Sequence, residues 1–505
     1  MDKYLHIGSH KDLTGRDRAI YRMFEILPGF LSWGTLAAVV FFSWAAPVGV
    51  AVFIIAFDIY WLIKTFYLSL HLRANWKRLV KNRNADWERK LENFKWDHIW
   101  QLVILPVCKE NYGVLSETFE ALLKSKWPKG RMIVVLAAEE RARAADQENA
   151  GRIAEKYGPC FGRFLVSWHP DRLDGEIPGK GSNTGWAAKI AKEKIIDPEK
   201  IPYENILVSS FDIDTQIYPQ YFLCLAHHFL SAEHPHRSSY QPVPVYNNNI
   251  WQAPALSRVV ATSGTFWQMM QQERPERLST FSSHSMSFKM LVDVGFWQKN
   301  IVSEDSRIFW NGLLFYDGDY RVVPLSYPVS MDANVGQTFW QTVKQVYKQQ
   351  RRWTWGVENL PYLLFGFLKN KKIPFGKKLR YVLTQFEGFW GLATNPILIF
   401  LLGWLPVFLG GDAFNATLLS YNLPRITRIL MTLAMLGLVG SAIISTSLLP
   451  PRPPGFGKRR FLAMIIQWLL IPLTIIFFGS IPGLDSQARL ALNKPLGFWV
   501  TPKNR

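Results

Sequence analysis

The chain has 505 residues, of which 49% are hydrophobic and 19% are charged. This composition excludes global disorder, and at about 150 residues per domain the length provides for roughly three domains. The formal net charge of +19 is compatible with nucleic acid, anionic lipid or a phosphorylated substrate as partner, whereas three cysteines without a zinc-binding spacing exclude a disulfide framework.

The first predicted elements are two membrane-spanning helices. No charged residue occurs at positions 27–57, and because one span needs about 20 apolar residues, we divide 27–70 into spans at 27–46 and 48–70. Basic residues flank both ends of this region: Arg16, Arg18, Arg22, Arg73, Lys77, Arg78, Lys81 and Arg83. Basic flanks tend to stay in the cytoplasm, so the pattern predicts a hairpin preceded by a cytoplasmic segment, residues 1–26.

Short apolar strands alternate with helical stretches in the middle of the chain, residues 75–356. Strands are expected at 99–107, 131–138, 163–169 and 205–211, and helices at 115–125 and 180–194. This alternation is typical of an α/β fold with a Rossmann-like, mainly parallel sheet, in which ligands bind at the carboxyl ends of strands. We therefore expect the chemistry of this domain at strand ends.

Two aspartates, Asp212 and Asp214, end the fourth predicted strand. Alternation along an extended chain places both carboxylates on one face. They repel each other unless a cation lies between them, and hard oxygen ligands suit Mg²⁺ or Mn²⁺. The pair thus predicts a divalent-metal site beside a diphosphate, although a D-x-D pattern is also common by chance.

Two helix starts in this domain carry charged residues. Lys180 follows Gly179, where an ammonium at a helix N-terminus suits a phosphate; the alternative is a tight turn with a solvent-facing lysine. Ser303 is expected to cap a second helix, with Glu304 and Asp305 in its first turn.

The sequence Gln-x-x-Arg-Trp closes the domain with Gln349, Arg352 and Trp353. Arginine neutralises diphosphates, and tryptophan stacks on sugar rings. The alternative is a basic helix beside the membrane with a tryptophan anchor.

Residues 357–384 are predicted to form an interfacial amphipathic segment. The stretch 360–368 is apolar but too short to cross a membrane. It is followed by Lys369, Lys371, Lys372, Lys377, Lys378 and Arg380. This pattern indicates a helix lying near anionic lipid, and the alternative is a core helix packed on the soluble domain.

About three further spans are predicted within residues 385–484. The uncharged runs are 388–411, 429–451 and 461–484. The basic link at 450–460 is expected in the cytoplasm, so the count is five spans, within a range of four to six. Five spans put the C-terminal tail, residues 485–505, outside.

The order of these motifs is more informative than any one of them. D-x-D, then Glu304-Asp305, then Gln-x-x-Arg-Trp and membrane spans resembles the membrane-integrated family 2 glycosyltransferases, among them the cellulose, chitin and hyaluronan synthases, over about residues 97–360. The resemblance implies a GT-A catalytic domain between transmembrane helices. It also implies a nucleotide-diphospho-sugar donor, a UDP-sugar first, and inversion at the anomeric carbon.

The resemblance also assigns roles to individual residues. It implies that Asp305 is the general base, with Glu304 beside it, and that Asp214 and Asp212 hold the metal, Asp212 also touching the donor. Further donor-site residues are implied at Glu110, Glu139, Lys180, Gln349, Arg352 and Trp353. Lys180 and Arg352 would face the diphosphate, Gln349 and Trp353 would line the donor and acceptor site, and Glu110 would contact the nucleobase.

Three features depart from the family pattern or conflict with the span count. Glu139 stands where the family usually has aspartate, and residues 281–288 replace the aromatic-Cys-Gly motif of processive enzymes, so processivity stays open. His284 in that segment is either an acceptor contact or a structural histidine. The tail at 498–503 looks like the family's ending, which usually lies on the cytosolic side, and this conflicts with five spans.

The prediction is therefore an integral protein of the plasma or inner membrane with a cytoplasmic catalytic domain. It extends a polysaccharide or glycolipid acceptor; the alternative is a non-processive, lipid-linked sugar transferase. A transporter or channel would need ionisable residues inside the spans, and the three C-terminal runs have none. A nucleic-acid partner is not expected, because the basic residues lie beside the spans and no recognition module is present.

Overall fold

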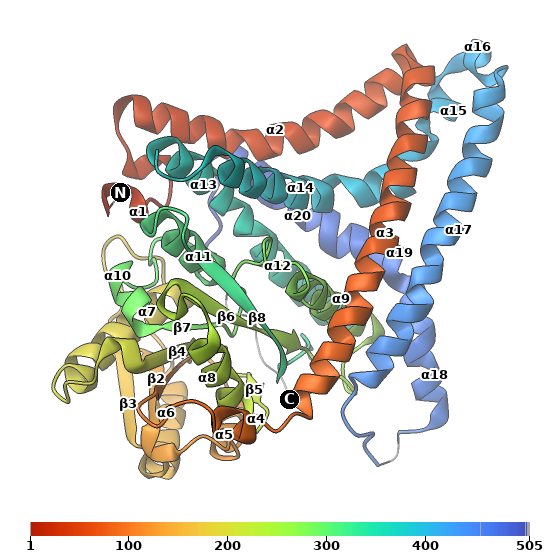
Figure 1. Ribbon diagram of the computed structural model, residues 1–505. Helices are drawn as coiled ribbons and strands as arrows, with labels where there is room; N and C mark the ends of the chain where they lie inside the picture. Colours follow the sequence, from red (N-terminus) through yellow and green to blue (C-terminus); the bar gives the residue numbers. More distant parts are fainter. Residues whose placement is uncertain (1, 455, 500, 502–505) are drawn as a thin grey trace.

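The computed structural model describes residues 2–454, 456–499 and 501. The predicted soluble domain, residues 75–356, is built on an eight-stranded sheet in the order β3-β2-β1-β4-β7-β6-β8-β5. Long helices from both ends of the chain lie above it and to its right in Figure 1. The strands are β1 Trp100–Pro106, β2 Met132–Glu139, β3 Arg163–His169, β4 Ile206–Ser210, β5 Gln216–Ile217, β6 Ser238–Val245, β7 Ser285–Ser287 and β8 Arg321–Ser330.

The first half of the sheet is parallel, which confirms the predicted α/β class. β1 pairs with β2 and β4, and β2 pairs with β3, all in parallel. Helices α5 (Tyr112–Leu123) and α7 (Lys180–Ala191) cover opposite faces, because alternate strand residues enter two separate apolar clusters. A strand covered on both faces is mainly apolar, as in β2, where every residue is buried and all but the last, Glu139, are apolar.

The second half of the sheet is mixed and was not predicted. β7 runs antiparallel to β4 and β6, β6 and β8 are parallel, and β5 is antiparallel to β8. Prolines interrupt β6 and β8, and proline disfavours a central strand. This half places the segment before β7 beside the end of β4.

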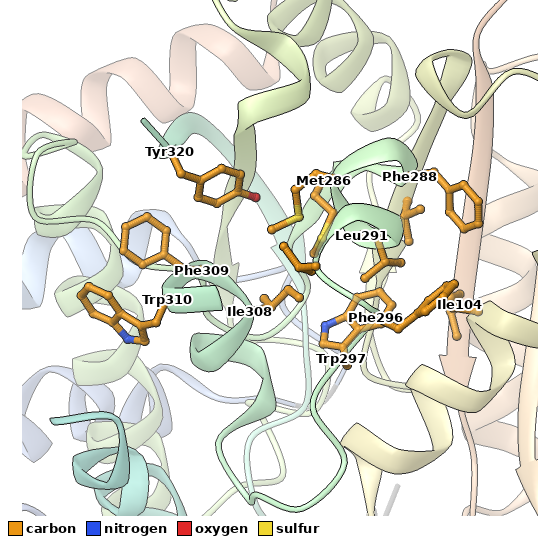
Figure 2. Packing of buried hydrophobic residues seen from close by; sticks show 14 of the residues in the cluster. Ile104, Met286, Phe288, Leu291, Phe296, Trp297, Ile308, Phe309, Trp310 and Tyr320 are labelled. Carbon is orange, nitrogen blue, oxygen red and sulfur yellow. The ribbon is translucent and has the colours of Figure 1, made fainter. Parts of the chain in front are cut away.

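Helix α11 (Glu304–Phe315) is fixed by a large apolar cluster shared with β7 and α10 (Phe288–Asp293). Figure 2 shows part of this cluster, in which side chains of α11 lie beside those of β7 and α10. Ile308, Phe309 and Trp310 are each almost fully buried. The packing holds the N-terminal end of α11 in a defined place.

The start of the chain also packs on α11. The carbonyl oxygen of Leu5 accepts hydrogen bonds from Asn311 Nδ2 (2.7 Å) and from the Tyr362 hydroxyl (2.8 Å). The carbonyl oxygen of Ile7 accepts one from Arg307 (2.9 Å). Leu5 and Ile7 are therefore hydrogen-bonded to α11 and to Tyr362, ahead of the first long helix.

Four helical segments among the described residues are long and apolar enough to cross a membrane. They are α2 (Gly15–Ala45), α3 (Pro47–Arg83), α17 (Leu418–Ser447) and the segment Phe461–Ala491. Helix α14 (Phe375–Phe400) and Leu402–Leu409 meet at a bend of 50° and make a fifth if the pair is one span. The number of candidates is thus four or five.

Helix α13 (Asn359–Lys369), in the predicted interfacial segment, lies between α11 and α2. Leu360, Tyr362, Leu363 and Phe365 are each at most 1% exposed. This burial favours the second interpretation of the stretch, a helix packed within the protein.

The C-terminal tail lies against the soluble domain. The ring of Phe498 occupies the space where a side chain on Gly179 would lie, and the guanidinium of Arg352 lies 5.0 Å from its centroid. The tail and the soluble domain are therefore on the same side of any membrane that the long helices cross. This differs from the tail position that five spans require.

Candidate active site

Most of the predicted site residues come from four elements that converge at the carboxyl edge of the parallel strands. Asp212 and Asp214 follow β4, Lys180 begins α7, and Glu304 and Asp305 begin α11. The last turns of α12 (Phe339–Thr354) supply Gln349, Arg352 and Trp353. Residues far apart in the sequence are thereby brought together.

Lys180 joins two of these elements. Its ammonium nitrogen lies 2.6 Å from Asp212 Oδ1 and 2.9 and 2.8 Å from the two carboxylate oxygens of Asp305. Burial lowers the pKa of Lys180, but the carboxylates of Asp212 and Asp305 raise it by more, so the pKa is above its usual value. The residue is 8% exposed, which excludes the solvent-facing alternative.

Asp212 and Asp214 have separate partners in this structure. Asp212 Oδ2 accepts a hydrogen bond from the Ser282 hydroxyl (2.6 Å), and Asp214 Oδ2 accepts one from the backbone N–H of Asp332 (2.9 Å). Asn248 Nδ2 donates to both the Asp214 carbonyl oxygen and Asp332 Oδ1. Sequence reasoning missed Ser282, Asn248 and Asp332, because no recognisable motif contains them.

The carboxylate oxygens of Asp212 and Asp214 fit a divalent ion that also binds a substrate. The described residues contain no group of three or more His, Cys, Asp or Glu side chains arranged to hold a metal. Mg²⁺ usually binds one or two carboxylates together with phosphate oxygens and water. The two aspartates offer hard oxygen ligands of that kind, without a complete protein cage.

Glu304 and Asp305 are neighbours in different environments. Glu304 is 2% exposed, and neither of its carboxyl oxygens has a hydrogen-bond partner among the residues that the structure describes. Burial, and then the charge of Asp305, raises the pKa of Glu304 to about 8. Glu304 is therefore mostly protonated at neutral pH, whereas Asp305 is paired with an ammonium.

Two further groups complete the immediate surroundings of Asp305. His284 is fully buried, and its Nδ1 lies 2.9 Å from the carbonyl oxygen of Phe281 and 3.7 Å from Asp305 Oδ1. Burial lowers the pKa of His284, so the imidazole is neutral. The Thr280 hydroxyl donates to the backbone carbonyl of Asp305 at 2.5 Å.

The aromatic residues of the site meet at the end of α12. The Trp353 ring lies 5.9 Å from that of Tyr246 and 5.6 Å from that of Phe281, measured between centroids. A small cavity is lined by Tyr246, Gln349 and Trp353. These contacts favour a place for Trp353 in the site over the membrane-anchor alternative.

Glu110 and Glu139 lie at the ends of the neighbouring strands β1 and β2. Glu110 Oε2 accepts hydrogen bonds from the backbone N–H groups of Cys108 (2.8 Å) and Lys109 (2.9 Å), so this carboxylate closes its own turn. Glu139 is 5% exposed and forms an ion pair with Arg141. Arg141 was missed, because a single arginine after a strand carries no sequence signal.

Comparison with known proteins identifies one family. A family model described as "Glycosyl transferase family group 2" matches residues 207–478. No curated protein sequence matches the chain.

The chain is similar to two solved proteins at low identity. One is the mannosyltransferase PcManGT from Pyrobaculum calidifontis, solved in complex with GDP-Man and Mn²⁺; the match is 12% identical, covers 87% of this chain and 99% of that chain, and has a TM-score of 0.43. The other is TarS 1–349 from S. aureus. This match is 14% identical, covers 69% of this chain and 91% of that chain, and has a TM-score of 0.36. TarS 1–349 has also been solved with UDP-GlcNAc, with a TM-score of 0.35.

Proposed function

Since the chain belongs to glycosyl transferase family group 2 and is therefore a glycosyltransferase, we propose that it transfers a sugar from a nucleotide-diphospho-sugar to an acceptor at a membrane. A UDP-sugar is the first candidate donor, and a growing polysaccharide or a glycolipid is the acceptor. The observation that carries the proposal is the buried ammonium of Lys180 between Asp212 and Asp305. It joins the proposed donor-binding carboxylate to the proposed base.

The proposed reaction is a single displacement with inversion. Asp305 takes the proton of the acceptor hydroxyl as that oxygen attacks the anomeric carbon, while the bond to the diphosphate breaks. Negative charge grows on the leaving diphosphate, and buried cations stabilise it most strongly. Lys180 and Arg352 supply this positive charge, and Asp212 and Asp214 would hold Mg²⁺ or Mn²⁺, which neutralises the diphosphate when bound.

The other site residues are proposed to bind the substrates. Glu110 and Glu139 lie at adjacent strand ends, where a nucleobase would reach both. Gln349 and Trp353 line the donor and acceptor site, with the indole as the stacking surface for a sugar ring. Glu304, protonated at neutral pH, leaves Asp305 as the carboxylate that is paired with the ammonium.

The protein is proposed to be integral to the plasma or inner membrane, with its catalytic domain in the cytoplasm. Four long apolar helices and the basic residues at their ends support this arrangement. Membrane lipids are then permanent partners, and nucleic acid is not expected. Transfer to a lipid-linked acceptor without processive extension is the second candidate, favoured by the absence of the aromatic-Cys-Gly motif from residues 281–288.

The test is nucleoside-diphosphate release by the purified protein with Mn²⁺ or Mg²⁺, over a panel of UDP- and GDP-sugars with membrane lipids as acceptor. We expect turnover with one donor and a loss of about 10²- to 10⁴-fold in Asp305→Asn, because the amide cannot accept the proton. The matched control is Asp293→Asn, since Asp293 is a similarly exposed acid that pairs with Lys289 on α10. Equal release by wild type and Asp305→Asn would refute the assignment of the base.

A further inference from the structure

Glu358 contacts the chain immediately ahead of α11. It ends the short helical turn η7 (Trp355–Glu358), which directly follows α12. Its Oε1 accepts hydrogen bonds from the backbone N–H groups of Val302 (3.1 Å) and Ser303 (2.8 Å) and from the Ser303 hydroxyl (2.7 Å). The side chain is thus directed at the residues that precede Glu304 and Asp305.

The same carboxylate is held from its other side. Glu358 Oε2 accepts a hydrogen bond from the Trp355 indole N–H at 2.8 Å. The residue is 7% exposed, and no side-chain ion pair involving it occurs among the described residues. A buried carboxylate without a cationic side-chain partner is costly unless N–H and O–H groups solvate it. Here those groups belong to the start of α11 and to η7.

Ser303 shows that this contact replaces an ordinary helix cap. Ser303 precedes α11, but its side chain makes no capping hydrogen bond to that helix. Its hydroxyl donates to Glu358 instead, so the cap expected from the sequence does not form. The first turn of α11 therefore takes its position from a residue outside the helix.

Hydrogen bonds of Arg307 and Asn359 add to the contact between Glu358 and the start of α11. Arg307 is fully buried and donates to the carbonyl oxygen of Glu358 (3.2 Å) and to Asn359 Oδ1 (2.5 Å). Asn359 Nδ2 donates to the hydroxyls of Ser303 (3.1 Å) and Ser306 (2.8 Å). Residues 358 and 359 together hold both ends of the first helical turn, and Asp305 lies within that turn.

We propose that Glu358 is a positioning residue for Asp305. It fixes the start of α11 relative to α12, so that the base keeps its distance from Lys180 and from the donor-binding residues of α12. The inference rests on the proposed function in taking Asp305 as the base. In this role Glu358 itself touches neither the substrates nor the reacting atoms.

The test compares kcat and the donor KM of Glu358→Gln with those of wild type. Glutamine keeps one acceptor oxygen but turns an NH₂ group toward either the Trp355 indole or the N–H groups of Val302 and Ser303. We expect kcat to fall about 10- to 100-fold, since displacements of about 1 Å at a reacting group have effects of this size, with the donor KM changed by less than about threefold. Glu25→Gln is the control, because Glu25 is also buried and hydrogen-bonded but lies on α2, with His10 and Arg22 as partners.

A milder variant covers the case in which Glu358→Gln does not fold. Ser303→Ala removes one donor to Glu358 and one acceptor of Asn359 Nδ2 but leaves both backbone N–H groups, so we expect a smaller fall in kcat at constant KM. The loss in the double variant should be smaller than the sum of the two single losses, because both changes act on the same group of contacts between residues 358 and 359 and the start of α11. Additive losses would overturn the inference.

The outcomes separate this inference from the proposed function. Wild-type kcat in Glu358→Gln together with an inactive Asp305→Asn would overturn only the positioning role. Full activity of Asp305→Asn would remove the base itself. Equal losses of kcat and of thermal stability in Glu358→Gln and Glu25→Gln would reduce Glu358 to a general contribution to folding and would also overturn the inference.

Discussion

Glu304 and Asp305 differ in chemistry although they are adjacent, because the start of α11 turns them toward different neighbours. Asp305 faces the Lys180 ammonium, whereas Glu304 lies against Gly181 on α7 and is shielded from water. Two neighbouring acids in such different environments are typical of sites in which one acid acts as a base.

The raised pKa of Glu304 makes stability depend on pH. Its carboxyl titrates near 4.5 in the unfolded chain and at about 8 in the folded one, so between these values the folded state holds a proton that the unfolded state has lost. The contribution to stability is complete below pH 4.5 and is lost as pH rises through 8. We expect the thermal unfolding midpoint in detergent to fall over this window, and to fall less in Glu304→Gln. Parallel curves for the two proteins would contradict the protonated state of Glu304.

Residue types in the site were predictable from the sequence, but their contacts were not. Asp212, Asp214, Glu304 and Asp305 stand out because acids follow an apolar strand or begin a helix. The contact of Lys180 with Asp305 joins residues 125 positions apart, and no local pattern encodes it. Glu358 was missed for the same reason, since its partner Ser303 is 55 positions away.

At the scale of elements, the parallel strands were predictable because they are continuous apolar runs. β3 has the predicted bounds, and β1, β2 and β4 differ from the predictions by one residue at each end. β7 was not predictable, because Ser-Met-Ser has no apolar pattern and becomes a strand only by pairing with β4 and β6. Tertiary pairing decides such short segments, not local propensity.

The close approach of α13 to α11 leads to a prediction at this scale. A side chain on Gly366 would overlap the Leu314 side chain, which is fully buried, so Gly366→Ala must displace Leu314 within the packed core. We expect a loss of about 1–3 kcal/mol in the free energy of unfolding, measured by thermal denaturation in detergent. Gly376→Ala, in the first turn of α14 with nothing within 4 Å of the added carbon, is the control and should be neutral or slightly stabilising. Equal midpoints for both variants would show that the contact is looser than described.

At the scale of the whole molecule, the most apolar candidate span does not have the contacts of a crossing helix. Near one end of Phe461–Ala491, Gln467 accepts a hydrogen bond from Arg258 on α9 (Ala255–Gln272) at 2.7 Å. Near its other end, Asp485 pairs with Arg351 on α12 at 3.0 Å. Both ends therefore meet the same soluble domain. Without this segment the candidate spans are α2, α3, the bent α14 pair and α17, and an even number of crossings agrees with a tail that lies beside that domain.

Cysteine labelling tests this arrangement in intact cells. We expect Ala413→Cys, exposed between α14 and α17, to react with a membrane-impermeant maleimide from outside. Lys494→Cys in a Cys160→Ser background should react only after permeabilisation, as should the exposed native Cys160, which reports the soluble domain. Labelling of Lys494→Cys in intact cells would restore the five-span count.

The contact of the first residues with α11 has a consequence for biosynthesis. Arg307 is 300 positions after Ile7, so it leaves the ribosome long after its partner. At roughly 5–20 residues per second, that interval is about 15–60 s, and the carbonyl groups of residues 5 and 7 lack these hydrogen-bond donors throughout it. α2 and α3 can enter the membrane during this time, before α11 and α13, the helices that carry these donors, have been synthesised. Residues 5 and 7 are thus synthesised before α11 but reach their folded position only after it.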